Sequence, residues 1–461
     1  MQIRTSVAAK FFVAALVAIV SITGCSSGSD DGTSPGGSDE TLLGGYTVSS
    51  ETTNKVTDGV NQLKYVLTKT DSTMTSGTKA NNLYVLDVDP SKNTNLEVSL
   101  GMPNGMVRGL GTASEFATYL DSNSTASVVG GVNGDFFDTV SGGPAGYSMH
   151  DGRWLSTGEY STLDTTSTNH TYPGWAFGIK SDGSAIIAQP SIALTFDSFT
   201  GTTQDSDNVV INALNQLRSD ATSTTSQPAL VLAARADNYI VLYTPDYYTS
   251  TSTADGGVEV TFTTSDTVKS NGTVTGTVTA VSSSTGNSTL ASGTMILSGY
   301  GTGATALSAI EVGDTITIAV TVGSEWADVV ECLGGGRHDG GPLLVQNGAV
   351  YAEDTTIVDY TSFYGNNPRT AVGVRADGTY FFYVVDGRNT GVSDGATIAE
   401  LSQFAVDLGA TIAVNLDGGR SSTMITGTGT KGTYNLVNQP CYAKTLDVER
   451  EDGNGFFILE K

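Results

Sequence analysis

The segment 368–423 constrains the fold most, because strand-forming runs alternate there with turn signals and each run ends beside charged residues. Residues 371–375 and 379–385 are rich in β-branched and aromatic side chains. Only a short loop containing Asp377-Gly378 separates them, and this pattern is typical of a β-hairpin.

The hairpin also predicts a register. Pairing Arg375 with Thr379 and counting outward places Arg369 opposite Val385. The guanidinium of Arg369 is therefore expected to start beside the carboxylate of Asp386.

A helix and a further strand follow the hairpin. Apolar residues recur at helical spacing over 398–408, Gly409 provides a C-terminal stop, and 411–416 is typical of a buried strand. A strand, helix and strand in this order predict a right-handed parallel crossover, which brings Asp386 and Asp417 to one sheet edge. The predicted fold class is α+β, with a mixed-sheet core and flanking helices.

The charged residues at this edge favour a binding site. Two carboxylates, Asp386 and Asp417, would meet two guanidinium groups, Arg369 and Arg388, as an anionic sugar substrate requires. Small residues and hydroxyls in 418–423 would allow the backbone to approach an oxyanion. The structural alternative is ordinary Asp-Gly turns and an exposed ion pair contributing a few tenths of a kcal/mol.

Elsewhere the chain is rich in β-strand patterns. A capping box at Thr112 and Glu115 predicts a helix, and residues 127–132 predict a buried strand that leads into Asn133. Alternating Thr, Ser and Val between about 190 and 325 predict antiparallel strands of an inserted β-rich subdomain.

Four ordered motifs resemble the phosphodiester glycosidase domain, which bacterial envelope and exopolysaccharide-associated proteins share with the mammalian mannose 6-phosphate uncovering enzyme. They are Gly-Val-Asn-Gly-Asp-Phe-Phe at 131–137, a Gly-Pro motif at 333–348, Arg-Thr-Ala-Val-Gly-Val at 369–374 with Val-Asp-Gly-Arg at 385–388, and Asn-Leu-Asp-Gly-Gly at 415–419. The resemblance spans roughly residues 60–460. Asp135 and Arg420 stand where the family usually has glycine, and residues 337–340 interrupt the Gly-Pro motif.

The resemblance implies a hydrolase that cleaves a sugar 1-phosphodiester, such as a GlcNAc-1-phosphodiester, in cell-envelope or extracellular glycans. Asp417 or Asp386 would stabilise or trap an oxocarbenium-like transition state. The predicted substrate- or phosphate-binding residues are Arg369, Arg388, Asn133, Asn415, Gly418, Gly419, Ser421 and His338. The alternative is an envelope lipoprotein that binds glycans, or serves exopolysaccharide assembly, without catalysis.

The N-terminal residues predict a lipid-anchored envelope protein. Residues 1–24 resemble a bacterial lipoprotein signal peptide that ends just before Cys25, the expected lipidation site. Residues 25–59 carry the anchor and a flexible Ser/Gly/Asp-rich tether, and residues 60–461 form the glycosidase-like domain, with 190–325 as its insertion.

The amino-acid composition limits the kinds of partner and cofactor that this chain is expected to bind. A formal net charge of −25 argues against nucleic acid. With three histidines and no Cys-x-x-Cys pair, no metal site or required cofactor is predicted, although an oxygen-liganded divalent cation stays open. Cys332 and Cys441 are expected either to form one disulfide or to be two separate buried thiols. A monomer is expected.

Overall fold

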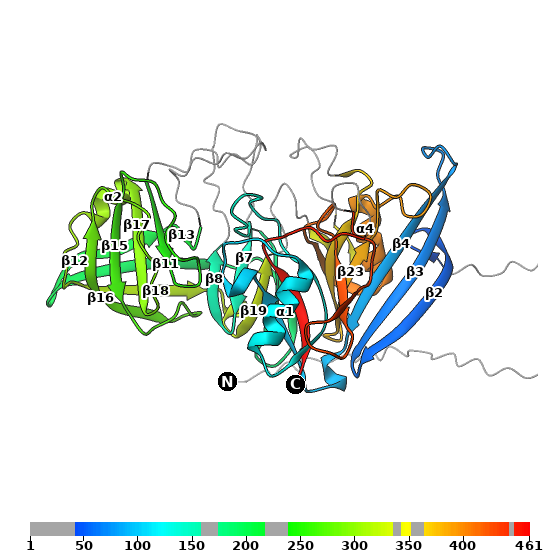
Figure 1. The fold of residues 1–461 in the computed structure, drawn as a ribbon, viewed down its shortest axis with the longest axis horizontal. Helices are drawn as coiled ribbons and strands as arrows, with labels where there is room; N and C mark the ends of the chain where they lie inside the picture. Colours follow the sequence, from blue (N-terminus) through cyan, green and yellow to red (C-terminus); the bar gives the residue numbers. More distant parts are fainter. Residues whose placement is uncertain (1–41, 158–173, 217–237, 335–342, 352–363, 442–446) are drawn as a thin grey trace, which may run out of the picture. The chain divides into compact units, whose positions relative to one another are not determined.

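The described residues of the computed structural model are 42–157, 174–216, 238–334, 343–351, 364–441 and 447–461. Most of them lie in β-sheets (Figure 1), and the described helices are few: α1 (Ala113–Asn123), α2 (Thr302–Leu307) and α4 (Ile398–Asp407), with the short 3-10 turns η1 (Pro90–Lys92), η2 (Pro103–Gly105) and η3 (Ser324–Trp326). The α+β prediction with flanking helices is therefore wrong. Residue types with strong strand preference and alternating polarity dominate the chain, and only a few segments keep helical spacing. None of the described helices combines the length and apolar character that crossing a membrane requires.

The sheet that carries the predicted hairpin has nine strands, in the order β1-β2-β3-β4-β23-β22-β24-β20-β21. Its strands are β1 (Leu42–Leu43), β2 (Tyr46–Thr57), β3 (Val60–Thr70), β4 (Thr78–Val88), β20 (Leu343–Gln346), β21 (Ala349–Val350), β22 (Arg369–Arg375), β23 (Tyr380–Val385) and β24 (Ala410–Asn415). The hairpin of β22 and β23 has the predicted register, with Arg369 opposite Val385.

The predicted parallel crossover is wrong in one respect. Strand β22 lies between β23 and β24 and pairs antiparallel with both, so β23 and β24 run in the same direction without being neighbours. Their ends still reach the same edge, because two strands antiparallel to a common neighbour must point the same way. The common edge for Asp386 and Asp417 is thus retained.

Two five-stranded sheets complete the part of the fold that surrounds this edge. The β19 sheet contains, in order, β10 (Ala185–Ala188), β9 (Ala176–Lys180), β19 (Val329–Gly334), β7 (Tyr147–His150) and β8 (Arg153–Thr157). The β6 sheet contains β26 (Tyr434–Leu436), β25 (Met424–Gly427), β6 (Ser127–Asn133), β27 (Gly455–Glu460) and β5 (Leu96–Gly101).

Aromatic side chains join these three sheets. The Phe177 ring lies 5.5 Å from the Phe382 ring and 5.4 Å from the Phe456 ring, measured between centroids. The three residues belong to β9, β23 and β27, and all are fully buried. Burial of each ring contributes about 2 kcal/mol or more, so this contact fixes the sheets around the candidate site.

The remaining sheet has eight strands between Ile192 and Val322. In order they are β12 (Thr203–Ile211), β11 (Ile192–Thr200), β18 (Thr315–Val322), β16 (Thr273–Ser282), β15 (Val258–Thr263), β17 (Thr294–Gly301), β14 (Asn238–Tyr243) and β13 (Ala213–Leu214). Among all named strand pairs of the described residues, only β13 with β14 is parallel. The antiparallel strands predicted for this region are present. The sheet belongs to the single compact unit formed by residues Thr41–Lys461.

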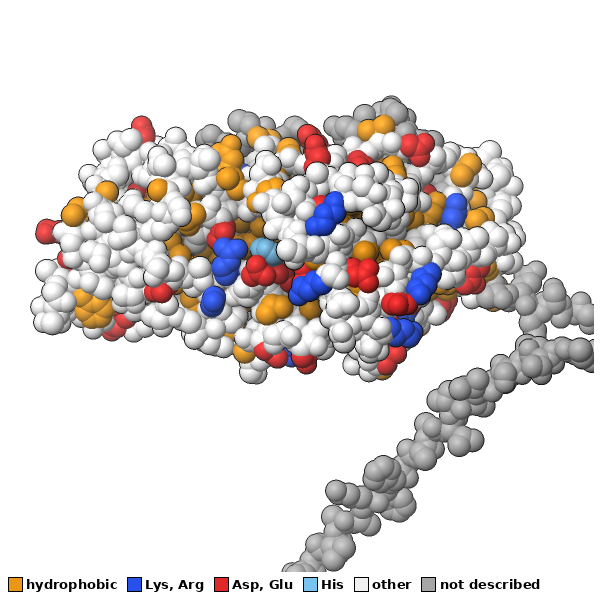
Figure 2. Space-filling view, turned by 60° about the horizontal axis from the view of Figure 1, so that its bottom comes forward, with side chains coloured by type: hydrophobic (Ala, Val, Ile, Leu, Met, Phe, Trp, Pro, Cys, Tyr) orange, Lys and Arg blue, Asp and Glu red, His pale blue; other side chains and the backbone are white. Residues whose placement is uncertain are grey.

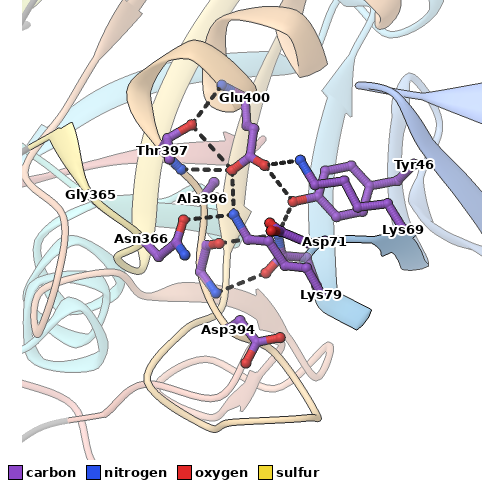
Figure 3. A network of polar contacts seen from close by, with 12 residues as sticks. Tyr46, Lys69, Asp71, Lys79, Gly365, Asn366, Asp394, Ala396, Thr397 and Glu400 are labelled. Carbon is purple, nitrogen blue, oxygen red and sulfur yellow. Dashed lines mark hydrogen bonds and ion pairs between the residues drawn. The ribbon is translucent and has the colours of Figure 1, made fainter. Parts of the chain in front are cut away.

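Helix α4 is anchored at its first turn by a buried polar network (Figure 3). Thr397 and Glu400 form a capping box, and the Glu400 carboxylate also accepts from Lys69 and, at 2.5 Å, from the buried Lys79. The Tyr46 hydroxyl donates to Glu400 Oε1 at 2.7 Å. These contacts tie the helix to β2, β3 and β4, and so fix the connection between β23 and β24.

Candidate active site

The candidate site lies where β22 begins and where β23 and β24 end. Asp386 follows β23, Asp417 lies two residues after β24, and Arg369 is the first residue of β22. A fourth element reaches the same place, because Asn133 at the end of β6 donates from Nδ2 to the Asp417 carbonyl at 2.8 Å. In the turn after β6, the Gly134 carbonyl accepts a backbone hydrogen bond from the Asp417 amide at 3.0 Å.

Asp417 is held by three groups. Its Oδ2 accepts from the Ser421 hydroxyl at 2.6 Å, and its Oδ1 accepts from the Gly418 amide at 2.9 Å. Arg450 Nη1 lies 3.7 Å from Oδ2 and donates to Ser421 Oγ at 2.9 Å. Burial raises the pKa of Asp417, while Arg450, Ser421 and Gly418 act to lower it.

Arg450 and its neighbour Asp452 are absent from the sequence prediction. Asp452 is 2% exposed, and burial together with the charge of Asp417 raises its pKa well above the ordinary value. The run Arg450-Glu451-Asp452 has the pattern of a solvated surface segment, so neither residue was predicted to belong to the site. The Gly453-Asn454-Gly455 that follows, just before a strand, was the signal that this segment passes close to other backbone.

Asp386 occupies a separate environment at the same edge. Its Oδ1 accepts from Asn438 Nδ2 at 3.0 Å and from the Gln439 amide at 2.9 Å, and burial raises its pKa. Asn438 also donates to the Ser422 carbonyl at 3.0 Å, which connects Asp386 to the loop that follows Asp417. The two carboxylates thus belong to neighbouring but distinct groups of contacts.

A cavity of about 390 Å³ lies between β2–β4 and β25–β26. Lys64 and Tyr84 line it, with the Lys64 ammonium 5.3 Å from the centre of the Tyr84 ring. Burial and, after it, the carboxylate of Asp386 raise the pKa of Tyr84.

Arg369 does not point into an open cleft. It is 3% exposed, and it donates from Nε to the Ala396 carbonyl at 3.0 Å and from Nη2 to the Gly365 carbonyl at 2.8 Å. Burial and the neighbouring charge of Arg388 lower the pKa of Arg369 to about 10. These contacts give Arg369 a role in holding the loops on either side of β22.

Arg388 has the exposed position at this edge. Its backbone adopts a φ of 60°, and its Nη2 donates to Asn367 Oδ1 at 2.9 Å. A Cβ at Gly419 would lie 3.1 Å from Arg388 Nη2, so the guanidinium rests against the Asp-Gly-Gly loop. A non-glycine residue in the left-handed region costs about 1 kcal/mol or more, and such strain is common at functional sites.

Both glycines of the loop are required for close packing. Gly419 has a φ of 65° and donates to the Pro368 carbonyl at 2.8 Å, and a Cβ at Gly418 would lie 2.9 Å from the same carbonyl oxygen. The loop is thereby pressed against the start of β22.

The other predicted site residues are placed as follows. Asn133 is buried, and its Oδ1 accepts from the Thr370 hydroxyl at 2.8 Å and the Thr423 amide at 3.0 Å. Asn415 is buried and donates to the Leu416 carbonyl at 2.7 Å. His338 and Cys25 lie outside the described residues. Ser421 and Gly418, described above, are the predicted residues that donate to the Asp417 carboxylate.

Cys332 and Cys441 are both free, buried thiols in the structure, which corresponds to the second alternative drawn from the sequence; the disulfide is not formed. Cys332 lies in β19, whereas the Cys441 thiol lies near the Gly419 carbonyl. Burial raises the pKa of both thiols.

A second cluster of potential ligand side chains lies at the β19 sheet. His150, Asp151 and Glu331 each present a ligand atom, and these atoms lie within 4.8 Å of one another. Glu331 is already bonded, because its carboxylate accepts from His150 Nδ1 and Asp151 N, both at 2.9 Å, and from Leu100 N at 2.9 Å. Glu331 and His150 therefore form an internal ion pair, in which the Glu331 carboxylate is already engaged by three donors.

In a comparison with known proteins, one family model matches part of the chain. Residues 267–459 match the family model of the phosphodiester glycosidases, which confirms the predicted resemblance over this segment. The matched segment contains Arg369, Asp386, Asp417 and Asp452, whereas Asn133 lies outside it. Among curated proteins, none matches this sequence.

Solved structures share the fold. A putative exported protein from Burkholderia pseudomallei is 19% identical, with a TM-score of 0.62, and the alignment covers 92% of this chain and 98% of that one. A hypothetical protein from Synechocystis is 17% identical with a TM-score of 0.60, covering 89% of this chain, which spans 64% of the Synechocystis chain. The zebrafish N-acetylglucosamine-1-phosphodiester alpha-N-acetylglucosaminidase catalytic domain aligns with 15% identity and a TM-score of 0.44 over 89% of this chain and 88% of its own.

Proposed function

We propose, from the premise that residues 267–459 belong to the phosphodiester glycosidase family, that this chain hydrolyses a sugar 1-phosphodiester in cell-envelope or extracellular glycans. The observation that carries the proposal is the arrangement around Asp417. A buried carboxylate held by Ser421 and Arg450 stands on a glycine loop, and an exposed guanidinium, that of Arg388, rests against the same loop.

The proposed division of labour follows from the charges. Cleavage between the anomeric carbon and the phosphate oxygen develops positive charge on the sugar ring, which a nearby carboxylate stabilises or traps. We assign this role to Asp417 in preference to Asp386. Asp417 lies on the glycine loop beside Arg388, whereas Asp386 faces Asn438 and Gln439.

The phosphate is assigned to exposed arginines. Phosphate leaves readily once its charge is neutralised, and a guanidinium neutralises it with two hydrogen bonds in a fixed geometry. Arg388 and Arg420 are exposed and flank Gly419, whereas Arg369 is occupied by the carbonyls of Gly365 and Ala396. Arg369 therefore serves the loops in this proposal, and Arg388 serves the substrate.

The test is release of free sugar from a panel of nucleotide sugars and a GlcNAc-phosphoryl-mannoside. Asp417→Asn should lower kcat by about 10³-fold or more with the fold retained, since it removes a charge needed in the transition state. Asp377→Asn is the matched control, because Asp377 lies in the exposed turn of the β22–β23 hairpin, at the end away from the candidate site. Turnover unchanged in both Asp417→Asn and Asp386→Asn would overturn the site assignment.

A non-catalytic glycan-binding lipoprotein is the second candidate. The sequence features that favour it are the predicted lipidation site at Cys25 and the charged substitutions Asp135 and Arg420. Under that function the wild-type protein binds phosphoglycan fragments, Arg388→Ala weakens the binding, and no sugar is released. Release of sugar by the wild-type protein would exclude it.

A further inference from the structure

Asp452 is a buried acid that the proposed division of labour leaves without a role. It is 2% exposed, and its Oδ1 has no hydrogen-bond partner among the described residues. A buried carboxylate oxygen without a partner is costly, and the usual resolution is to hold a proton. The groups that surround Asp452 therefore decide whether its carboxyl is protonated.

The backbone places Asp452 against the Asp417 loop. Asp452 N donates to Gly111 O at 2.7 Å and Gly111 N donates back to Asp452 O at 3.0 Å, which fixes the segment on one side. On the other side, Asn454 accepts from Gly134 N at 3.0 Å, and Gly134 O accepts from Asp417 N at 3.0 Å. The segment and the Asp417 loop are therefore bonded to the same turn.

The side chains meet around Ser421. Arg450 donates to Ser421 Oγ at 2.9 Å, and Ser421 donates to Asp417 Oδ2 at 2.6 Å. One hydroxyl has one proton to give, so Ser421 cannot donate to a second carboxylate at the same time. Arg450 stacks on Phe137 at 4.8 Å from the ring centre, which holds the guanidinium in this position.

We propose that Asp452 and Asp417 share one proton around Ser421, with Asp452 holding it so that Asp417 stays ionised for the reaction. Asp452 is a positioning residue in this scheme, because it acts through the charge state of Asp417. The functional part of the inference rests on the proposed glycosidase activity, whereas proton sharing itself does not.

The charged groups around the pair favour this order of titration. Arg450 and Ser421 act to lower the pKa of both carboxyls, the Gly418 amide supports the charge of Asp417 alone, and Glu449 adds a further negative charge near Asp452. Burial raises the pKa of both acids, and the charge of Asp417 raises that of Asp452 further. Two close carboxyls lose their protons in two steps, and the second step belongs mainly to the acid with less support for its charge.

The first test needs no activity. An acid whose pKa is raised on folding stabilises the fold below its unfolded pKa of about 3.9, and that stability is lost as the pH rises toward the folded pKa. Asp452→Asn removes this dependence, so it should raise the unfolding midpoint at pH 7 by about 2 °C or more and change little at pH 3.5. The gain should be smaller in an Asp417→Asn background, because Asp452 then loses the neighbouring charge.

Two results would contradict proton sharing between Asp452 and Asp417. Destabilisation by Asp452→Asn at pH 7 would mean that Asp452 is ionised and paired, and additive effects of the two substitutions at pH 7 would mean that the acids are independent. Asp121→Asn is the matched control. This buried carboxylate accepts from Val128 N, Gly432 N and the Tyr434 hydroxyl, so its loss should be destabilising.

The second test addresses the reaction. If the protein turns over a sugar 1-phosphodiester, the wild-type kcat/KM should fall at alkaline pH as Asp452 ionises, and Asp452→Asn should remove that limb while keeping the acidic limb of Asp417. An unchanged alkaline limb in Asp452→Asn would overturn the role of Asp452 in catalysis. Absence of turnover in the wild type would count against the proposed function alone, since the unfolding measurements stand without it.

Discussion

At the scale of single residues, Asn133 is the connection on which the site depends. Its amide contacts Thr370 in β22 and both Asp417 and Thr423 in the loop between β24 and β25. Asn133→Ala leaves these buried groups without partners, so we expect a loss of about 3 kcal/mol in the free energy of unfolding. Urea denaturation measures it, with the exposed Asn95→Ala as control; an equal, small effect of both substitutions would contradict this reading.

Prediction from the sequence succeeded for backbone positions and was less complete for side-chain partners. Counting along the hairpin placed Arg369 opposite Val385 correctly, because antiparallel register follows from turn length and the two-residue period of strands. The direction of the Arg369 side chain depends on the loops around Gly365 and Ala396, which no periodicity encodes. Asp452 was missed for the related reason that burial of a charged residue is decided by distant segments.

At the scale of elements, the first turn of α4 shows how local signals and tertiary contacts combine. Gly409, with a φ of 89°, ends the helix region as its position in the sequence predicts. The local capping box is reinforced by Lys69 and Lys79, which come from β3 and β4. Sequence spacing predicted the helix, but it could not predict that β22 would separate the two strands that the helix connects.

The same cap predicts a pH dependence of stability. Burial by itself raises the pKa of Glu400, but Lys69, Lys79, Thr397 and Tyr46 together lower it to about 2. A carboxyl with a lowered folded pKa stabilises the fold above its unfolded pKa of about 4.3, and this contribution is lost as the pH falls toward 2. Glu400→Gln should therefore cost about 3 kcal/mol at pH 7, mainly because Lys79 is left buried without its counter-charge.

Chemical denaturation between pH 7 and pH 2.5 measures this difference, which should shrink below about pH 4.3. Glu115→Gln is the matched control, since Glu115 forms the equivalent capping box of α1 and its described hydrogen bonds are to Thr112. That substitution should cost roughly 0.5 kcal/mol, because Gln keeps an acceptor for the capping box and only the charge at the helix N-terminus is lost. A cost at Glu400 no larger than at Glu115 would show that the lysines contribute little.

At the scale of the whole molecule, the predicted fold class failed although many of its strands were predicted. Residues 258–263 and 315–322, for example, are strands within the region where antiparallel strands were predicted. Which strands become neighbours is set by pairings between distant segments, such as β4 with β23 and β6 with β25. Helical crossovers were inferred from one strand, helix and strand sequence, whereas the assembled sheets are almost entirely antiparallel.

The net charge of the whole chain predicts that its stability depends on salt concentration. Acidic and basic side chains lie near one another on the face shown in Figure 2, yet the chain carries 47 acidic against 22 basic residues. Self-repulsion acts over about 30 Å at 0.01 M salt and about 8 Å at 0.15 M, so added salt relieves the repulsion of the compact state.

The unfolding midpoint should therefore rise by a few degrees, about 2 °C or more, between 0.01 M and 0.15 M NaCl at pH 7. Choline chloride at the same ionic strength is the control, because screening depends on ionic strength and specific cation binding does not. Equal rises in both salts would assign the effect to screening. A fall in the midpoint with added salt would mean that ion pairs such as Arg375–Asp87, at 2.7 Å, outweigh the repulsion, since salt weakens attraction between partly exposed charges as well.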